Sequence, residues 1–353
     1  MSLYMKELSD KKELLKNRLG RVVSPKIVDF IERPVTEPKD NELVIKIVSS
    51  AICGSDMHIF SGKHPSAPLP VTIGHEFSGD VAALGKDVTR FKAGDRVTVE
   101  PCVTCGKCDA CLHGNYGYCE NIIFFYRNGA GAMAEYITVG ESNAYHLPEH
   151  LSYNAGALIE PMSVAVHAVR RANIALGEKV LVIGAGAIGI LVTAFCKQCG
   201  ASDILVSDYS ASRLNKAKEF GATLTVNLHE EDLEKAVRQI SGGTGMDKTF
   251  ECVGMESTFI QAMTNLRKNG LATILGIFEE PNITINAMRF ITHQIMVQGS
   301  QGYCWDYPIA IKMSEHIDTE KLITHEFPLN ELQKALETCF DPKAESIKVI
   351  LKP

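Results

Sequence analysis

The chain has 353 residues, of which 45% are hydrophobic and 22% charged, and its formal net charge is −6. This composition is ordinary for a globular protein, and the length predicts about two domains. A negative charge without blocks of like charge argues against binding to nucleic acid or to an anionic membrane, so a small molecule is the expected partner.

The start of the chain and its cysteine content favour a location in the cytoplasm. Segment 1–20 is charged throughout and does not resemble a secretory signal. The apolar stretch 180–196 contains clustered glycines, which argues against a membrane span. We therefore expect a cytoplasmic protein, in which the eleven cysteines are metal ligands or buried thiols rather than disulfides.

Up to about residue 160, the pattern predicts an all-β module. Short β-branched runs such as 42–49 and 96–100 are separated by segments rich in Gly, Pro and Asp. Such a pattern is typical of short strands joined by long loops. Metal and substrate sites on this module are expected on its loops.

Four cysteines in the segment 99–120 follow the spacing C-x2-C-x2-C-x7-C, namely Cys105, Cys108, Cys111 and Cys119. Four thiolates on one loop can enclose a zinc ion, and a fully occupied shell predicts a structural metal rather than a catalytic one. Cys102 adjoins this series, which is complete without it. The alternative, a disulfide cluster, is disfavoured by the expected reducing compartment.

After residue 160, buried-type strands alternate with helical patterns. The expected strands are 179–183, 203–207, 223–226, 248–252, 271–276 and 295–299, with helices among them beginning at Ala187 and at 210 and a third through Ala236. This alternation predicts a doubly wound parallel sheet covered on both faces. Beyond Ser300, a helix near 329–339 and a strand 347–351 are expected to pack back on the first module.

A glycine motif, GAGAIG, follows the strand 179–183 and opens the next helix. Its candidate cofactor-binding residues are Gly184, Gly186, Ile188 and Gly189. The glycines permit a tight turn and the close approach of a pyrophosphate, which the N–H groups of the helix N-terminus can bind. The alternative is a glycine-rich turn without a ligand.

The second strand of this region is followed by Asp208, 24 residues after Gly184. This separation is typical of the carboxylate that binds the adenosine ribose of a dinucleotide. Its charge would repel a 2′-phosphate, which favours NAD over NADP. Arg213 is a further cofactor-binding candidate, because a nearby Arg can accept that phosphate.

Four dispersed residues are candidate ligands of a second, catalytic metal. Cys53 lies in AICGSDMHIF, His75 and Glu76 lie in TIGHEFSG, and Glu160 precedes a proline in ALIEPM. One thiol, one imidazole and carboxylates make an open shell that suits a zinc ion admitting water or a substrate oxygen. A core thiol, a loop histidine and a helix-start carboxylate are the structural alternatives, and spacing does not choose between them.

The string GHEFSGDVAALGKDV, followed by KAGDRV, resembles the signature of zinc-dependent alcohol dehydrogenases in the medium-chain dehydrogenase/reductase family. CGSDMH together with IEP is most similar to the sorbitol (polyol) and threonine dehydrogenase branch. The resemblance covers nearly the whole chain. It implies a GroES-like all-β catalytic domain, 1–162 and 300–353, and a Rossmann NAD-binding domain, 163–299. It also implies two zinc ions per subunit, NAD, and a homodimer or homotetramer.

The resemblance also implies roles for individual residues near the catalytic metal. Cys53, His75 and either Glu76 or Glu160 resemble the zinc ligands, and the choice between the two glutamates stays open. Asp56 resembles the carboxylate that orients the ring of the zinc-bound histidine, or else it caps the helix that follows.

Two residues of the same segment resemble the family's proton relay. Ser55 resembles the hydroxyl that passes the substrate proton toward His58, whose imidazole exchanges protons with water. The alternative for His58 is a surface histidine without a role.

Together these features predict a zinc-dependent oxidoreductase that transfers a hydride between NAD and a polar secondary alcohol, such as a sugar alcohol or a cyclitol. Gly302 stands where polyol dehydrogenases carry the Arg of an Arg-Tyr pair, beside a retained Tyr303, which argues against the hydrogen-bond pattern of sorbitol. An L-threonine 3-dehydrogenase or a hydroxy-acid dehydrogenase of the same family is the alternative.

Two other classes of protein are disfavoured. A zinc-free quinone reductase would lack Cys53, His75 and the cysteine loop. A non-enzymatic binding protein that retained the fold would be expected to have lost a metal ligand or a glycine of the motif.

Overall fold

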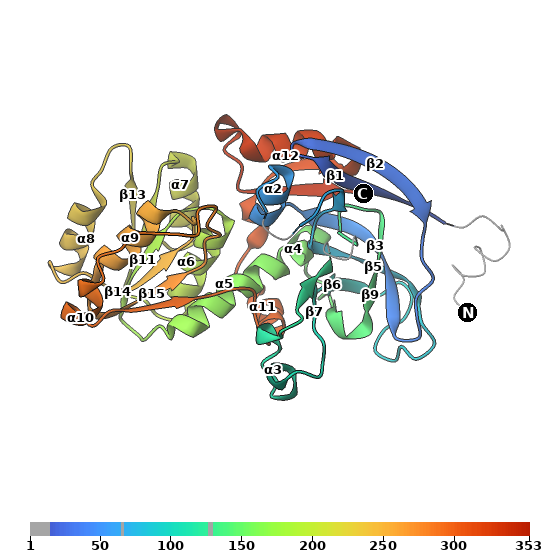
Figure 1. Cartoon of the computed structure of the whole chain (residues 1–353), viewed down its shortest axis with the longest axis horizontal. Helices are drawn as coiled ribbons and strands as arrows, with labels where there is room; N and C mark the ends of the chain where they lie inside the picture. Colours follow the sequence, from blue (N-terminus) through green and yellow to red (C-terminus); the bar gives the residue numbers. More distant parts are fainter. Residues whose placement is uncertain (1–14, 65–66, 126–129) are drawn as a thin grey trace. The chain divides into compact units, whose positions relative to one another are not determined.

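The computed structural model describes residues 15–64, 67–125 and 130–353. They form two compact units, one comprising the described chain up to Glu160 together with Asp318–Pro353, and the other Pro161–Ile317 (Figure 1). The first unit is rich in β-strands and the second is a parallel α/β unit, as predicted. The exact domain boundaries, at 162 and 300, stay predictions.

The first unit is built on a sheet with the order β10-β6-β5-β3-β18-β17, in which β9 also pairs with β3. These strands are β3 (Glu42–Ala51), β5 (Glu76–Leu84), β6 (Arg96–Val99), β9 (Tyr136–Gly140), β10 (Ala144–His146), β17 (Ile323–Pro328) and β18 (Lys348–Lys352). Apolar side chains from neighbouring strands, including Leu43, Phe77, Val97 and Ile137, form its core. The predicted return of the chain to this module is confirmed, because β18 pairs antiparallel with β3.

Smaller elements complete the first unit. A second sheet has the order β2-β1-β4, and a two-stranded ribbon pairs β7 with β8. The bounds are β1 (Lys16–Ser24), β2 (Ile27–Pro34), β4 (Val71–Thr72), β7 (Cys102–Val103), β8 (Ile123–Phe124), α2 (Gly54–Phe60), α3 (Asp109–Leu112), α4 (Tyr153–Ala157) and α12 (Leu332–Phe340). Ile59 of α2 packs with Leu332 of α12 and Val349 of β18, which fixes α2 against the unit's core.

The second unit contains a six-stranded sheet with the order β13-β12-β11-β14-β15-β16, and every pair of neighbours is parallel. The strands are β11 (Lys179–Ile183), β12 (Asp203–Asp208), β13 (Leu224–Asn227), β14 (Met246–Glu251), β15 (Leu266–Ile274) and β16 (Met296–Gly299). The strand order reverses between β11 and β14, the position where open parallel sheets of this kind bind their ligands.

Helices cover both faces of this sheet (Figure 1). They are α5 (Ile159–Ala172), α6 (Ala187–Gln198), α7 (Ala211–Glu219), α8 (Leu233–Ser241), α9 (Glu256–Thr264), α10 (Met288–Thr292) and α11 (Tyr307–Met313). Leu181 and Ile183 of β11 pack in one core cluster with Val237 of α8 and Ala262 of α9. The alternate residues of β11 are buried too, which explains its uninterrupted apolar sequence.

A buried carboxylate joins α5 to the start of α11. Asp306 is fully buried and accepts hydrogen bonds from His167 Nδ1 at 2.7 Å, from the Cys304 N–H at 3.0 Å and from Arg170 Nη1. Burial opposes the ionisation of Asp306, but these partners outweigh it and lower its pKa.

Among the described helices, none combines the length and the apolar character needed to cross a bilayer.

Candidate functional site

The four cysteines of the predicted structural site come together in the first unit. The sulfurs of Cys105, Cys108, Cys111 and Cys119 all lie within 4.8 Å of one another. Sulfurs bound at about 2.3 Å to one tetrahedral zinc ion would be separated by about 3.8 Å, which is compatible with this cluster. Cys102 lies outside this cluster, in β7.

Backbone N–H groups lower the pKa of Cys105 and Cys108 and so favour their thiolate forms, whereas burial raises the pKa of Cys111 to about 12. The N–H of Cys108 lies 3.4 Å from the sulfur of Cys105, and the N–H of Cys105 lies 3.3 Å from the sulfur of Cys119. The N–H groups of Lys107 and Cys108 lower the pKa of Cys105 to about 6. Because the thiolate is the form that binds metal, the loop fits a zinc ion.

A second cluster consists of Cys53, His75 and Glu76, whose ligand atoms also lie within 4.8 Å of one another. Cys53 precedes α2, and Glu76 begins β5, where it pairs with Ala51 at the end of β3. This strand pairing brings the two segments of the chain together. His75 and Glu76 are buried, and Cys53 is partly buried.

Glu76 forms a buried ion pair that the sequence analysis did not predict. Its two oxygens lie 2.6 and 2.5 Å from Lys348 Nζ, which also lies 3.3 Å from the carbonyl oxygen of Ile52. Burial opposes the charge of Lys348, but the negative charges of Glu76 and Cys53 outweigh it and raise its pKa. The sequence signal was a lysine among the apolar residues of β18.

Glu160 lies in the first turn of α5 and is buried. Burial lowers the pKa of His75, but the charges of Cys53, Asp56 and Glu160 outweigh it and raise the pKa well above its usual value. The site therefore gathers a thiol and several carboxylates around one buried ammonium group. Buried carboxylates together with sulfur and nitrogen donors make a donor set that fits a divalent cation such as zinc.

Asp56 ties the two ligand-bearing loops together through their backbones. It accepts hydrogen bonds from the N–H of Cys53 at 2.9 Å and from the N–H of Gly74 at 3.0 Å. Its carboxylate oxygen lies 3.9 Å from His75 Nδ1, too far for a direct hydrogen bond. The predicted relay residues Ser55 and His58 are half-buried, and their spacing in α2 places them on one face of the helix.

The glycine motif forms the turn between β11 and α6. Gly184 has a φ of +94°, and a Cβ on Gly189 would lie 1.9 Å from the carbonyl oxygen of Gly184, so both positions require glycine. Gly186 precedes α6, and a Cβ built there meets no atom within 4 Å. The open space beside this helix N-terminus fits a pyrophosphate.

Asp208 holds this turn against the tip of β12. Its oxygens accept hydrogen bonds from the N–H of Ala185 at 2.7 Å and from the N–H of Ser210 at 2.8 Å. Arg213 lies in the first turn of α7, where its N–H donates to the side chain of Ser210 at 3.4 Å. Both predicted cofactor-binding residues therefore lie near the carboxyl edge of the sheet, on the side of the glycine turn.

Comparison with known proteins decides the family. Residues 39–149 match the family model of the alcohol dehydrogenase GroES-like domain, and residues 187–316 match that of the zinc-binding dehydrogenases. Sorbitol dehydrogenase of Bacillus subtilis is 34% identical over 326 residues, which are 91% of this chain and 92% of that protein. The chain belongs to the zinc-dependent alcohol dehydrogenase family. The predicted sorbitol (polyol) dehydrogenase-like branch is also confirmed.

Solved structures of this family support the same assignment. An Escherichia coli oxidoreductase of unknown specificity has a TM-score of 0.91 and 33% identity, and the match covers 96% of this chain and 99% of that one. A zinc-binding dehydrogenase from Sinorhizobium meliloti bound to NADP has a TM-score of 0.89 and 28% identity, covering 96% and 100%. This zinc-dependent alcohol dehydrogenase is therefore an oxidoreductase that uses zinc and a nicotinamide dinucleotide.

Proposed function

We propose that this enzyme oxidises a polar secondary alcohol of the sugar-alcohol or cyclitol class with NAD and reduces the corresponding ketone in the reverse direction. The proposal is carried by the buried cluster of Cys53, His75 and Glu76, which offers a mixed donor set suited to an open zinc site. The similarity to sorbitol dehydrogenase supports the substrate class.

The distances favour Cys53, His75 and Glu76 as the residues that would hold the catalytic zinc, with Glu160 as a further negative charge nearby. When bound, zinc supplies a Lewis acid that lowers the pKa of the substrate hydroxyl. Asp56 fixes the backbone of the loops that carry Cys53 and His75, so it keeps the ligand atoms in place.

The hydroxyl proton needs a path to water. We assign this path to Ser55 and His58, because the two half-buried side chains lie one turn apart on α2. The hydroxyl of Ser55 accepts the proton and donates its own, and the imidazole of His58 passes a proton to solvent.

Asp208 supports a preference for NAD over NADP. Its carboxylate is fixed by two backbone N–H groups at the end of β12, where it would bind ribose hydroxyls and repel a 2′-phosphate. The ratio of kcat/KM for the two dinucleotides tests this assignment. Equal kcat/KM values for NAD and NADP would contradict the role of Asp208. The comparison matters because a relative of this enzyme has been solved with NADP bound.

A substrate panel tests the proposed function. Polyols, cyclitols, L-threonine and hydroxy acids are each incubated with NAD, and NADH absorbance is followed with and without a chelator. We expect polyol or cyclitol turnover that chelation abolishes and added zinc restores. Turnover of L-threonine or hydroxy acids alone would overturn the substrate class.

Two substitutions test the metal assignment within the same assay. Cys53→Ser and His75→Ala should each abolish turnover while NADH binding, followed by fluorescence, persists. Cys199→Ser is the matched control, because Cys199 is exposed and belongs to neither cysteine-containing cluster. Retained turnover in either variant would contradict the assignment of a catalytic metal to this position.

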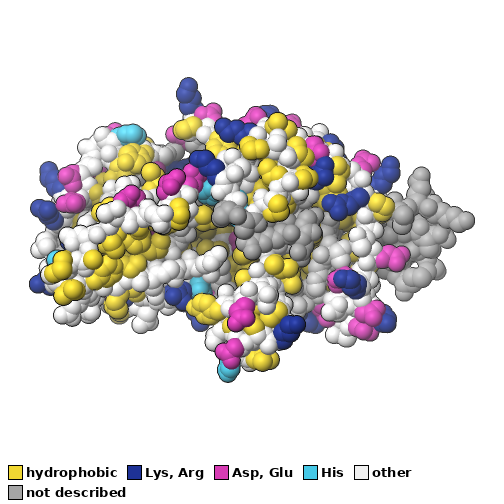
Figure 2. All heavy atoms as spheres, viewed as in Figure 1, with side chains coloured by type: hydrophobic (Ala, Val, Ile, Leu, Met, Phe, Trp, Pro, Cys, Tyr) yellow, Lys and Arg dark blue, Asp and Glu magenta, His cyan; other side chains and the backbone are white. Residues whose placement is uncertain are grey.

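We also propose that the enzyme is a cytoplasmic homodimer or homotetramer. Strand β16 ends the parallel sheet, and Met288, Ile291 and Met296 on α10 and β16 are exposed. Figure 2 shows hydrophobic side chains gathered over the second unit. Light scattering coupled to gel filtration gives the mass in solution, and a monomer would contradict this part of the proposal.

A further inference from the structure

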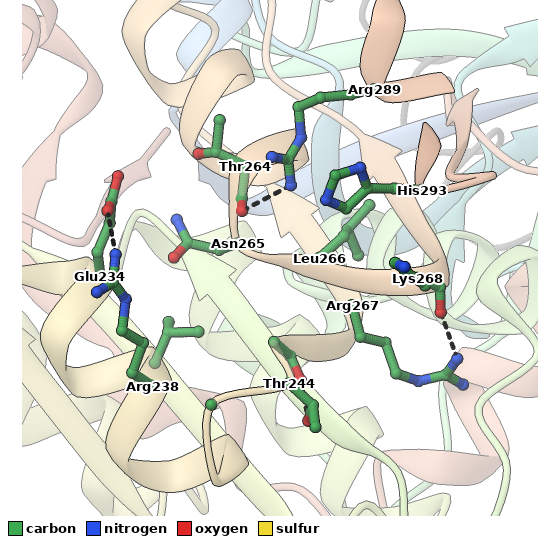
Figure 3. Close-up of a pocket in the computed structure, with 13 residues that line it drawn as sticks. Glu234, Arg238, Thr244, Thr264, Asn265, Leu266, Arg267, Lys268, Arg289 and His293 are labelled. Carbon is green, nitrogen blue, oxygen red and sulfur yellow. Dashed lines mark hydrogen bonds and ion pairs between the residues drawn. The ribbon is translucent and has the colours of Figure 1, made fainter. Parts of the chain in front are cut away.

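A cavity of about 650 Å³ lies within the second unit, at the amino-terminal edge of its parallel sheet (Figure 3). Its walls come from the end of α8, the loop 243–245 before β14, the start of β15, and α10. The glycine turn and Asp208 follow the carboxyl ends of β11 and β12. The cavity is therefore separate from the dinucleotide site, at the opposite edge of the same sheet.

The lining of this cavity is strongly cationic. Arg238, Arg267, Lys268 and Arg289 line it, and the imidazole of His293 adds a further nitrogen group. Among the described residues, Glu234 is the only carboxylate that lines it. Such a concentration of positive charge contrasts with the net charge of −6 of the whole chain. In Figure 3, Arg238, Arg289 and His293 lie on different sides of the hollow, whereas the guanidinium of Arg267 extends to the carbonyl oxygen of Lys268.

Ion pairs with neighbouring carboxylates neutralise only part of this positive charge. Arg238 lies 3.4 Å from Glu234, and Arg267 lies 2.5 Å from Asp247. Within residues 15–64, 67–125 and 130–353, no ion pair involves Lys268 or Arg289. Two of the four cations therefore have no carboxylate partner in the described part of the chain.

Hydrogen bonds hold Arg289 in place but do not involve all of its N–H donors. Its Nη2 donates to the carbonyl oxygens of Met263 at 3.3 Å and Thr264 at 2.9 Å, which offsets the negative end of α9. Its buried Nε has no hydrogen-bond partner among the described residues. The guanidinium of Arg289 is therefore incompletely paired within the described chain, and its positive charge favours an anion in the adjoining cavity.

We propose that this cavity binds a small molecule carrying a phosphoryl group. Guanidinium forks, an ammonium group and the side chains of Thr244 and Asn265 surround the hollow, and a tetrahedral phosphate can accept hydrogen bonds from several directions. The planar carboxylate group offers fewer such directions. This binding site is independent of the oxidoreductase function proposed above.

Inorganic phosphate is the test ligand, because it presents the phosphoryl oxygens and has no other group that could contact the protein. Isothermal titration calorimetry uses the full-length zinc-loaded enzyme with saturating NADH, which occupies the dinucleotide site. Malonate at the same ionic strength is the carboxylate comparison. We expect one phosphate per chain, bound more tightly than malonate, with an affinity that falls as salt is added.

Variants locate the binding. Arg238 and Lys268 are exposed, so the double variant Arg238→Gln/Lys268→Gln should fold normally and weaken phosphate binding about tenfold or more. Lys235→Gln is the matched control, since Lys235 is an exposed cation of α8 outside the lining. Unchanged binding in the double variant, equal weakening in the control, or no phosphate binding at all would overturn the site. Tighter binding of malonate would overturn its phosphoryl class.

Discussion

Lys348 Nζ lies within 2.6 Å of both carboxylate oxygens of Glu76, and neither side chain is more than 5% exposed. The pair links β18 to the first residue of β5, inside the candidate metal centre. A lysine at this position neutralises one carboxylate of a site that also contains Cys53 and Glu160. The pair therefore joins two strands of the first unit and reduces the negative charge of the site.

Lys348→Met should strongly destabilise the protein. Removing one partner leaves a buried carboxylate without its counter-charge, which costs about 3–5 kcal/mol. Urea denaturation of the chelator-treated enzyme measures the change, because a zinc ion bound to Glu76 would itself neutralise the carboxylate. Lys16→Met is the control, because the Lys16–Glu32 pair is exposed and should contribute less than about 1 kcal/mol. Equal effects of the two substitutions would contradict the importance of the buried pair.

Asp306→Asn should destabilise the second unit in a pH-dependent way. The folded pKa of Asp306 is lowered from 3.8, so its ionised form contributes stability above that value. This contribution disappears as the pH falls through the folded pKa. At pH 7 we expect the variant to lose about 2 kcal/mol, the scale of hydrogen bonds to a charged group.

Denaturant unfolding of both proteins from pH 7 down to pH 3 checks this expectation. The difference between Asp306 and its Asn variant should shrink once the pH falls below 3.8. A difference that stays constant over the whole range would show that the charge of Asp306 does not stabilise the fold.

Substitutions of two glycines in the same turn should have different effects. Gly186→Val places its side chain in open space, so it should lower the melting temperature only slightly, through the loss of a favourable N-cap, and raise the KM for NAD about tenfold or more. Gly189→Ala brings a Cβ to 1.9 Å from a backbone oxygen and should lower the melting temperature. Normal NAD binding by Gly186→Val would argue against a pyrophosphate in this turn.

Cys108→Ser should lower the stability of the fold more than it lowers the turnover rate. The variant loses one of four clustered sulfurs, and a structural zinc contributes directly to folding free energy. We expect zinc content to fall by about one ion per chain and the melting temperature to decrease. Elemental analysis and calorimetry measure both, with Cys199→Ser as the control. Full metal content with an unchanged melting temperature would contradict a structural role.

Local patterns made much of this molecule predictable. The strand Lys179–Ile183 is apolar on both faces because helices cover both sides of its sheet, and the glycine turn follows it directly. The cysteine loop is equally local, since its ligands lie on one short segment. In each case, the residues that act together are neighbours in the sequence.

Pairs distant in the sequence were not predictable in this way. Lys348 and Glu76 are 272 positions apart, and His167 and Asp306 are 139 apart. No spacing rule connects such residues, because their contact depends on how strands and helices pack. The direct contacts of Asp56 with two backbone N–H groups were likewise decided by the geometry of the loops.

The position of β18 has a consequence for biosynthesis. This strand pairs with β3, yet the whole of the second unit lies between them in the chain. The α/β unit is therefore synthesised before the lysine that neutralises Glu76. Until β18 is made, the first unit lacks both this strand and the counter-charge of Glu76, so its fold is completed after the second unit has been synthesised.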